Sequence, residues 1–459
     1  MAQKKWCLST DAKIGDEERP LRLGTASAAR TAGGVAPAQW QQCRGPVLEF
    51  GPMGMLHDSL DEYLAHLPNK VVTDLVVSKA KEQGLTLSKR EKATLERRFA
   101  AGDYSAISLK WRSPLRRKTI EITLTEAETN EAAERLKSVM DKLPDLVLGV
   151  CDDLAERVLT ILKSTWSRQA AFERQVLRHL KRELRDVWCE PLQLLAMLLA
   201  VAKEAGEQHN AEIRHSESLK LPNTVDVLTR LHARACMVAS DVRALLEAGF
   251  SDGALSRWRT LHEIAVVSFF VLEEGEETAG KFIVHQVVEN WKAARQYQSH
   301  CRRLGYEPLE PEEMTTLEQG YQAAVVNYGE SFKRDYGWAA GSFGRKNPTL
   351  ADLEARVGLD HWRPYYGMAC QSVHSTAKGL ALTLGLPEHS SALLAGPSSL
   401  GLTDPGQNTA ISLAQVTSAF FALGPTLDSL VASRIVVTLS GETCEAFATV
   451  DRGLSGPSG

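Results

Sequence analysis

The sequence predicts an all-α protein, a multi-helix bundle with a small basic helical module at its N-terminal end. Beyond residue 144, apolar residues recur every three or four positions, which is the period of an amphipathic helix. The breaks between these runs contain the Gly, Pro, Asn and Asp residues that favour turns. The stretch TIEITLT at 119–125 alternates as a strand does, so one short β segment is expected there.

At 459 residues the chain is long for one compact domain, and its composition divides it into four parts. The first part has no hydrophobic period and is expected to be disordered. An amphipathic run begins at Met53 and Met55, and one hypothesis is that translation starts at one of these residues instead of at Met1. The parts are a disordered tail (residues 1–52), a small basic module (53–143), a helical core domain (144–440) and a mobile tail (441–459).

Capping and turn residues place the individual helices. In the basic module, Thr125 and Glu128 form a capping box that opens a helix as far as about Met140. In the core, Gly249 suits the end of one helix and Asp252 the start of the next. The helices of the core are expected over residues 144–164, 168–206, 222–248, 252–274, 276–304, 311–336, 349–357, 362–384 and 408–440.

Composition excludes several functional classes. A net charge of −4 argues against a chain that binds nucleic acid over its whole surface, although it allows a local basic patch. The eight cysteines are scattered, unlike a disulfide framework or a zinc ligand set, so we expect no metal and no cofactor. The N-terminus lacks a secretory signal, and the longest apolar runs are about half a membrane span. We therefore expect a cytoplasmic protein with no membrane partner.

An apolar helix with a charged first half is the main candidate site. It contains S-R-W-R-T-L-H-E at 256–263 and is apolar on all sides from 264 onward. Because successive helical residues turn by about 100°, Arg259, His262 and Glu263 share one narrow stripe that leads into the core. Three interpretations stay open: a buried network that fixes helix packing, a polar pocket in which Arg259 binds an anion and His262 or Glu263 moves protons, or an exposed helix end.

A second helix, expected over 362–384, could complete such a site. His374 lies on a face with several small residues that would let another backbone approach, and Ser372 flanks it. The motifs S-R-W-R-T-L-H-E and Y-x-x-x-C-x-S-V-H (366–374) resemble those of a bacterial family of helical proteins of unknown function, over roughly residues 60–440. The resemblance implies an all-helical fold, with Arg259, Glu263, Ser372 and His374 as site residues.

The chain is also similar to the HEPN ribonucleases, which cleave RNA with arginine and histidine and without a metal. Arg257 and His262 match their R-x4-H pattern, in which arginine would stabilise charge on the phosphate and histidine would shuttle a proton. Arg257 and His262 lie about 140° apart on an ideal helix, so Arg259 paired with His374 is an equally good arrangement.

A basic segment in the N-terminal module favours a polyanion as partner. Residues 88–98 and 109–118 contain ten Lys or Arg residues, and Trp111 offers a ring for stacking on single-stranded bases. The alternative is a solvated helix face with an exposed hairpin. The candidate nucleic-acid-binding residues are Lys89, Arg90, Arg97, Arg98, Lys110, Trp111, Arg112, Arg116, Arg117 and Lys118.

Two hypotheses of function follow, with a small-molecule pocket as a third. In the first, the chain binds or acts on RNA, and a metal-independent ribonuclease of defence or toxin type is one form of it. Arg259 would then hold the phosphate, His374 or His262 would transfer protons, and Glu263 would orient the arginine. In the second, the chain is a non-catalytic interaction module whose Arg/His/Glu cluster is structural. Self-association is left open.

Overall fold

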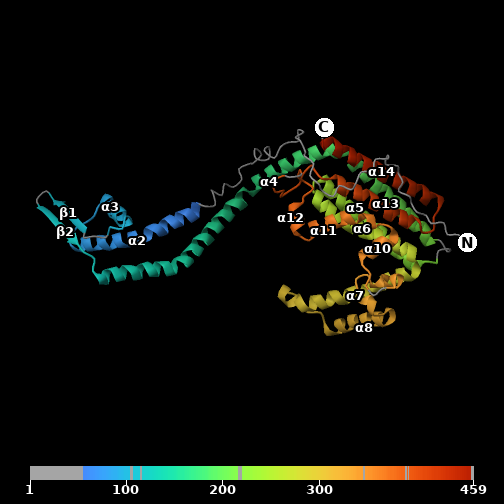
Figure 1. Ribbon diagram of the computed structural model, residues 1–459, viewed down its shortest axis with the longest axis horizontal. Coiled ribbons are helices and arrows are strands. Elements are labelled where there is room, and N and C mark those ends of the chain that lie inside the picture. The colour runs from blue at the N-terminus through green and yellow to red at the C-terminus, as the bar shows by residue number, and fades with distance from the viewer. Residues whose placement is uncertain are drawn as a thin grey trace. The chain divides into compact units, whose positions relative to one another are not determined.

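The computed structural model describes residues 55–103, 107–113, 116–215, 220–344, 347–387, 390 and 392–455 (Figure 1). The chain is all-α apart from one β-hairpin, as the sequence predicts. It forms two compact units that divide between Val176 and Leu177, and each is described by itself below. The expected disordered tail at 1–52 and the last four residues of the expected mobile tail lie outside the described residues.

The N-terminal unit is small and has its own core. It consists of α2 (Met55–Glu82), α3 (Lys89–Ala100), the hairpin of β1 (Ile107–Ser113) and β2 (Arg116–Ile122), and the first part of α4 (Glu126–His215). Its apolar centre joins α2, α3 and both strands. The residues that form it are Val76, Ala80, Leu85, Leu87, Leu95, Phe99, Ile107 and Ile122.

The hairpin only partly follows the sequence prediction. The β segment expected at 119–125 is confirmed as a strand, but β2 begins and ends three residues earlier. Its partner β1 was anticipated only through the exposed hairpin given as an alternative for 109–118, because the charges in LKWRS hide the apolar alternation that marks a strand. In the antiparallel register Ile107 pairs with Ile122, which places one buried apolar residue on each strand at the open end of the hairpin.

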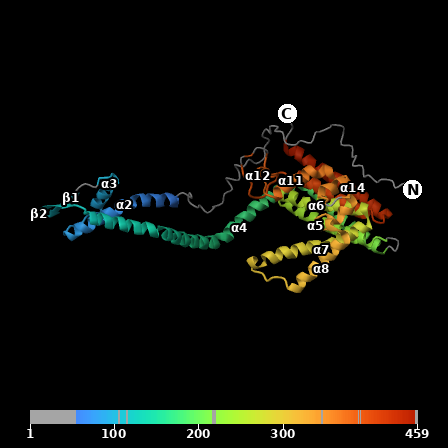
Figure 2. The ribbon, with the colours of Figure 1, turned by 60° about the horizontal axis from the view of Figure 1, so that its bottom comes forward.

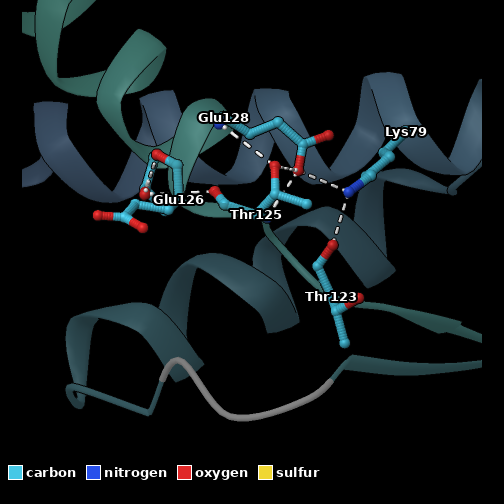
Figure 3. A network of polar contacts seen from close by, with 6 residues as sticks. Lys79, Thr123, Thr125, Glu126 and Glu128 are labelled. Carbon is cyan, nitrogen blue, oxygen red and sulfur yellow. Dashed lines mark hydrogen bonds and ion pairs between the residues drawn. The ribbon is translucent and has the colours of Figure 1, made fainter.

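Hydrogen bonds at the start of α4 join it to α2 (Figure 3). The predicted capping box is confirmed: the Thr125 amide donates to Glu128 Oε2 at 2.7 Å, and the Glu128 amide donates to Thr125 Oγ1 at 3.4 Å. Lys79 Nζ, from α2, donates to the same Glu128 oxygen at 2.6 Å and to the Thr123 carbonyl at 2.6 Å. The lysine and the Thr125 donors lower the pKa of Glu128 to about 2.

The long helix α4 continues where the sequence predicts breaks. It passes through Pro144 and through the gap expected between residues 164 and 168. Its one non-helical residue is Trp188, with φ −107° and ψ 16°. Pro191 explains this kink. It has no N–H to donate to the carbonyl four residues earlier, and its ring clashes with that carbonyl, so the preceding turn of the helix is distorted. The division between the units therefore lies inside α4, rather than at residue 144 where the sequence places the domain boundary.

The C-terminal unit is a helical bundle around α6 (Ser251–Glu274). Apolar side chains of α6 such as Trp258, Leu261 and Phe270 are completely buried. In both views α6 lies beside α5, and α13 also packs on it (Figures 1 and 2). The other α-helices of this unit are the part of α4 from Leu177 onward, α5 (Pro222–Glu247), α7 (Glu276–His300), α8 (Pro311–Tyr328), α9 (Ala340–Phe343), α10 (Leu350–Val357), α11 (Arg363–Val373), α12 (Ala377–Ala381), α13 (Thr403–Phe421) and α14 (Leu427–Ser455).

Three helices expected as continuous are divided in this unit, and the one predicted over 311–336 ends at Tyr328, before Gly329 with its φ of 88°. The helix predicted over 362–384 ends at Val373, and Ser375 adopts a left-handed φ of 47° before α12 begins. The helix predicted over 408–440 is divided into α13 and α14 at Gly424 (φ 57°), which is followed by Pro425. Residues 441–455, expected to be a mobile tail, continue α14. Of the helices that the structure describes, none combines the length and the apolarity needed to cross a membrane.

Candidate functional site

The polar stripe of α6 faces two short helices. α10 and α11 both contact α6, and they meet it at the turns that contain Arg259, His262 and Glu263. Six side chains from the three helices form what we call the α6 cluster. Its members are Arg259, His262, Glu263, Glu354, Arg363 and Tyr366.

The innermost pair of the cluster is His262 with Glu354. Their side chains are both 0% exposed, and His262 Nε2 lies 3.0 Å from Glu354 Oε1. A carboxylate can only accept, so the histidine donates from Nε2. The His262 ring lies between Trp258 and Tyr366, with ring centroids 5.5 Å and 5.7 Å away. Aromatic walls and a carboxylate therefore fix this imidazole in place, away from solvent.

The outer part of the cluster is a carboxylate shared by two donors. Glu263 Oε1 accepts a 2.6 Å hydrogen bond from the Tyr366 hydroxyl and lies 2.9 Å from Arg259 Nη2. The Arg259 and Glu263 side chains are 29% and 32% exposed, so solvent reaches both. Burial opposes the charge on Arg259, but Tyr366 and Glu263 outweigh it and raise its pKa.

Tyr366 connects the two parts. The guanidinium carbons of Arg259 and Arg363 lie 5.1 Å and 5.3 Å from the centre of its ring, within cation–π range. Arg363 Nε in turn lies 2.9 Å from Glu354 Oε2, so that carboxylate has a cationic or donor partner on each oxygen. Burial and the hydrogen bond to Glu263 raise the pKa of Tyr366, so its hydroxyl stays protonated and remains a donor.

The structure brings together three of the five predicted catalytic residues. Arg259, His262 and Glu263 are in the cluster, whereas Ser372 and His374 are exposed near and just beyond the end of α11. No contact among the described residues joins either of them to the cluster. The first arginine of the R-x4-H string, Arg257, pairs with Asp241 of α5 at 2.9 Å, while His262 turns to α10.

Half of the cluster, Glu354, Arg363 and Tyr366, is not among the site residues that the sequence predicts. Glu354 had a usable signal, because it lies on the apolar stripe formed by Leu350, Leu353 and Val357 in α10. The same argument that selected the α6 charges would have selected it. Tyr366 lies inside the S-V-H motif segment but was not assigned a role. Arg363 precedes Pro364 at the start of α11 and carries no sequence signal that separates it from a surface arginine.

The geometry limits which cluster residues could act on a ligand. His262 and Glu354 are sealed, so neither can reach a substrate without a rearrangement of α10 or α11. Arg259, Glu263 and Arg363 are partly exposed, and their side chains offer two guanidinium groups beside one carboxylate. Within the described parts of the chain, no three His, Cys, Asp or Glu side chains are grouped as metal ligands.

A second buried histidine lies on α5. The His232 ring stacks on Phe420 with centroids 4.9 Å apart, and its Nε2 lies 3.3 Å from Thr417 Oγ1. Burial lowers the pKa of His232 to about 4, and nearby His209 contributes in the same direction. The ring also borders an open cavity of about 520 Å³ with Lys203 on its wall. His232 is not among the site residues that the sequence predicts.

The predicted nucleic-acid-binding residues occupy α3 and the hairpin. Lys89, Arg90 and Arg97 are exposed on α3, and Arg98 is paired with Asp103 at 2.7 Å. In the hairpin register, Arg112 pairs with Arg117, so two basic residues hold opposite positions. The side chains of Lys110, Trp111, Arg112, Arg116, Arg117 and Lys118 lie outside the described part of the structure.

Fold and site together define a helical bundle with an Arg/His/Glu/Tyr cluster between α6, α10 and α11, of which His262 and Glu354 are buried and Arg259, Glu263 and Arg363 are partly exposed. Residues 225–390 match the model of a family of unknown function (DUF5677). The match extends from α5 to the loop after α12, and so includes every member of the α6 cluster as well as Ser372 and His374. Neither a curated protein nor a solved structure matches the chain.

Proposed function

We propose that this chain is an RNA-binding helical protein in which the N-terminal unit contacts the phosphate backbone and the α6 cluster is structural. The single observation that carries the proposal is the exposed basic surface of α3, which continues in sequence into a hairpin with five Lys or Arg residues. Lysine and arginine on one small module supply the sequence-independent attraction that dominates RNA affinity.

The contacts within the α6 cluster support a structural role for it. Both of its carboxylates have cationic or hydroxyl partners, and its histidine is sealed against α10. A proton-transfer group must come within hydrogen-bond reach of the proton that it moves, and His262 has no route to a substrate in this arrangement.

RNA binding is expected to depend on three exposed cations of α3. Changing Lys89, Arg90 and Arg97 to alanine should weaken binding of a single-stranded RNA about tenfold and reduce the slope of log affinity against log salt by roughly 2. Fluorescence anisotropy at several salt concentrations measures both. The matched control removes Arg302, Arg303 and Lys378, which are exposed on the other unit. An equal loss of RNA affinity in the two triple variants would contradict the proposal, because binding would then not depend on α3 in particular.

A metal-independent ribonuclease is the second candidate, favoured by the partial exposure of Arg259, Glu263 and Arg363. The arginines would bind the phosphate, and Glu263 would accept the 2′-hydroxyl proton as the 2′-oxygen attacks phosphorus. The P–O5′ bond would break, and the departing 5′-oxygen would take a proton from water. In this form of the proposal His374 and Ser372 would approach only with substrate bound.

The structural proposal expects no cleavage of total RNA by folded protein in EDTA between pH 6 and 8. Cleavage that disappears in Glu263→Gln, while RNA affinity and the circular dichroism spectrum stay unchanged, would instead establish the ribonuclease. Loss of cleavage in His374→Gln as well would assign the proton-transfer role to that histidine.

A further inference from the structure

The cavity beside His232 lies between α4 and α5 in the C-terminal unit. Its volume of about 520 Å³ is within the range of pockets that hold small molecules. Cys236 and Met237 of α5 and Phe420 of α13 form what we call its apolar wall. Its polar groups are the imidazole of His232, which is buried, and several side chains at the solvent-exposed edge. An apolar wall with a few polar groups is the usual composition of a small-molecule site.

Gly206 of α4 allows this histidine to lie directly against the helix. A β-carbon at position 206 would overlap the His232 ring and would lie 2.9 Å from its Nδ1 atom. Gly206 and His232 both border the cavity. The Nδ1 side of the imidazole therefore lies at the boundary between α4 and the cavity.

Hydrogen bonds make His232 Nδ1 an acceptor. Thr417 Oγ1 donates its one proton to the Leu413 carbonyl at 2.8 Å, so it can only accept from His232 Nε2, 3.3 Å away. Burial keeps the ring neutral by lowering its pKa to about 4, so Nδ1 carries a lone pair. Nδ1 has no partner among the described residues, and it is not closed off from solvent as the unpartnered Nδ1 of His209 is. An acceptor of this kind favours a ligand that carries a donor.

Two opposite charges occupy successive turns of α4 at the edge of the cavity. Lys203 Nζ reaches from α4 to Ser240 Oγ of α5 at 3.1 Å. Ser240 gives its own proton to the Cys236 carbonyl, so the lysine is the donor and keeps two N–H groups for a ligand. Glu207 is exposed and forms no ion pair or hydrogen bond within the described part of the chain. The β-carbons of Lys203 and Glu207 are about 6 Å apart, as for any two residues four positions apart on a helix.

These groups together select a zwitterion. The remaining acid of the cavity, Asp241, is neutralised by Arg257 at 2.9 Å, so Lys203 and Glu207 balance each other. A simple anion would satisfy the lysine but would lie beside an unpaired carboxylate, and a simple amine would leave the lysine unpaired. A free α-amino acid carries a carboxylate for Lys203, an ammonium group for Glu207 and His232 Nδ1, and a side chain for the apolar wall, all on one carbon atom.

We propose that the cavity between α4 and α5 binds a free α-amino acid with an apolar side chain, its carboxylate on Lys203 and its ammonium group on Glu207 and His232. The proposal goes beyond RNA binding and does not depend on it.

Three related probes test the class of ligand in the full chain. Isothermal titration calorimetry should give a dissociation constant below about 1 mM for L-leucine. Leucinamide, which lacks the carboxylate, and 4-methylpentanoate, which lacks the ammonium group, should each bind about tenfold more weakly, because each loses a charged contact. If none of L-leucine, L-methionine and L-phenylalanine binds in this range, or if the two analogues bind as tightly as L-leucine, the proposal is wrong.

Substitutions at the edge of the cavity test where the amino acid binds. Lys203→Met and Glu207→Gln change exposed side chains, so the fold should be kept, and each should weaken L-leucine binding about tenfold. The matched control is Glu204→Gln, which removes an exposed acid of the same helix that does not border the cavity. It should leave the affinity for L-leucine unchanged. An unchanged affinity in either Lys203→Met or Glu207→Gln would overturn the proposal.

Discussion

Replacing Glu354 by alanine is expected to lower the free energy of unfolding by about 3–5 kcal/mol. This carboxylate is completely buried, and its two oxygens face His262 Nε2 at 3.0 Å and Arg363 Nε at 2.9 Å. Its removal leaves a buried imidazole without an acceptor and a guanidinium without its counter-charge. Breaking a buried pair from one side is costly for this reason, even where the intact pair contributes little.

Two variants separate charge from packing in this experiment. Glu354→Gln keeps the shape and one acceptor for His262, so it should lose clearly less stability than Glu354→Ala when both are unfolded in urea. Glu445→Ala removes an exposed partner of Arg452 and should leave the stability nearly unchanged, because solvent screens a surface ion pair. A loss below 1 kcal/mol for Glu354→Ala would show that the cluster does not hold α10 and α11 on α6.

The charged stripe of α6 could be predicted because its physical signal is local. Ionic side chains within an apolar helix must either be paired or bind something, and Arg259, His262 and Glu263 share one face by helical geometry alone. Their partners could not be predicted, because the contact between Glu263 and Tyr366 spans 103 residues of chain. Which helix covers a face is decided by the packing of the whole bundle.

The position expected for His374 differs from the one in the structure for another reason. Sequence periodicity favours one helix through 384, which would have kept His374 on the face that carries Gly367 and Cys370. The helix instead ends at Val373, and Ser375 adopts a left-handed backbone conformation. Serine has no preference for this conformation, so the sequence does not predict the break. In α4 the error was the reverse: Pro144 suggested a boundary, but the helix continues through it.

Acidification is expected to destabilise the C-terminal unit through His232. Burial against Phe420 lowers the pKa of this histidine to about 4 in the folded state, from about 6.5 in the unfolded chain. Below pH 6.5 the unfolded chain therefore binds a proton that the folded chain refuses, and stability falls as the pH drops towards 4. Between pH 6.5 and pH 4 the free energy of unfolding is expected to fall by roughly 3 kcal/mol through this histidine.

The variant His232→Gln isolates this contribution, since glutamine fills similar space and does not titrate. Urea unfolding at several pH values between 4 and 7 should give a shallower dependence for the variant than for the wild type, whatever the variant costs in absolute stability. His209 on α4 has a pKa that burial also lowers, so part of the slope should remain. If His232→Gln follows the same curve as wild type, His232 is protonated in the folded state near its ordinary pKa, and Phe420 and Thr417 must then leave room for a charged ring.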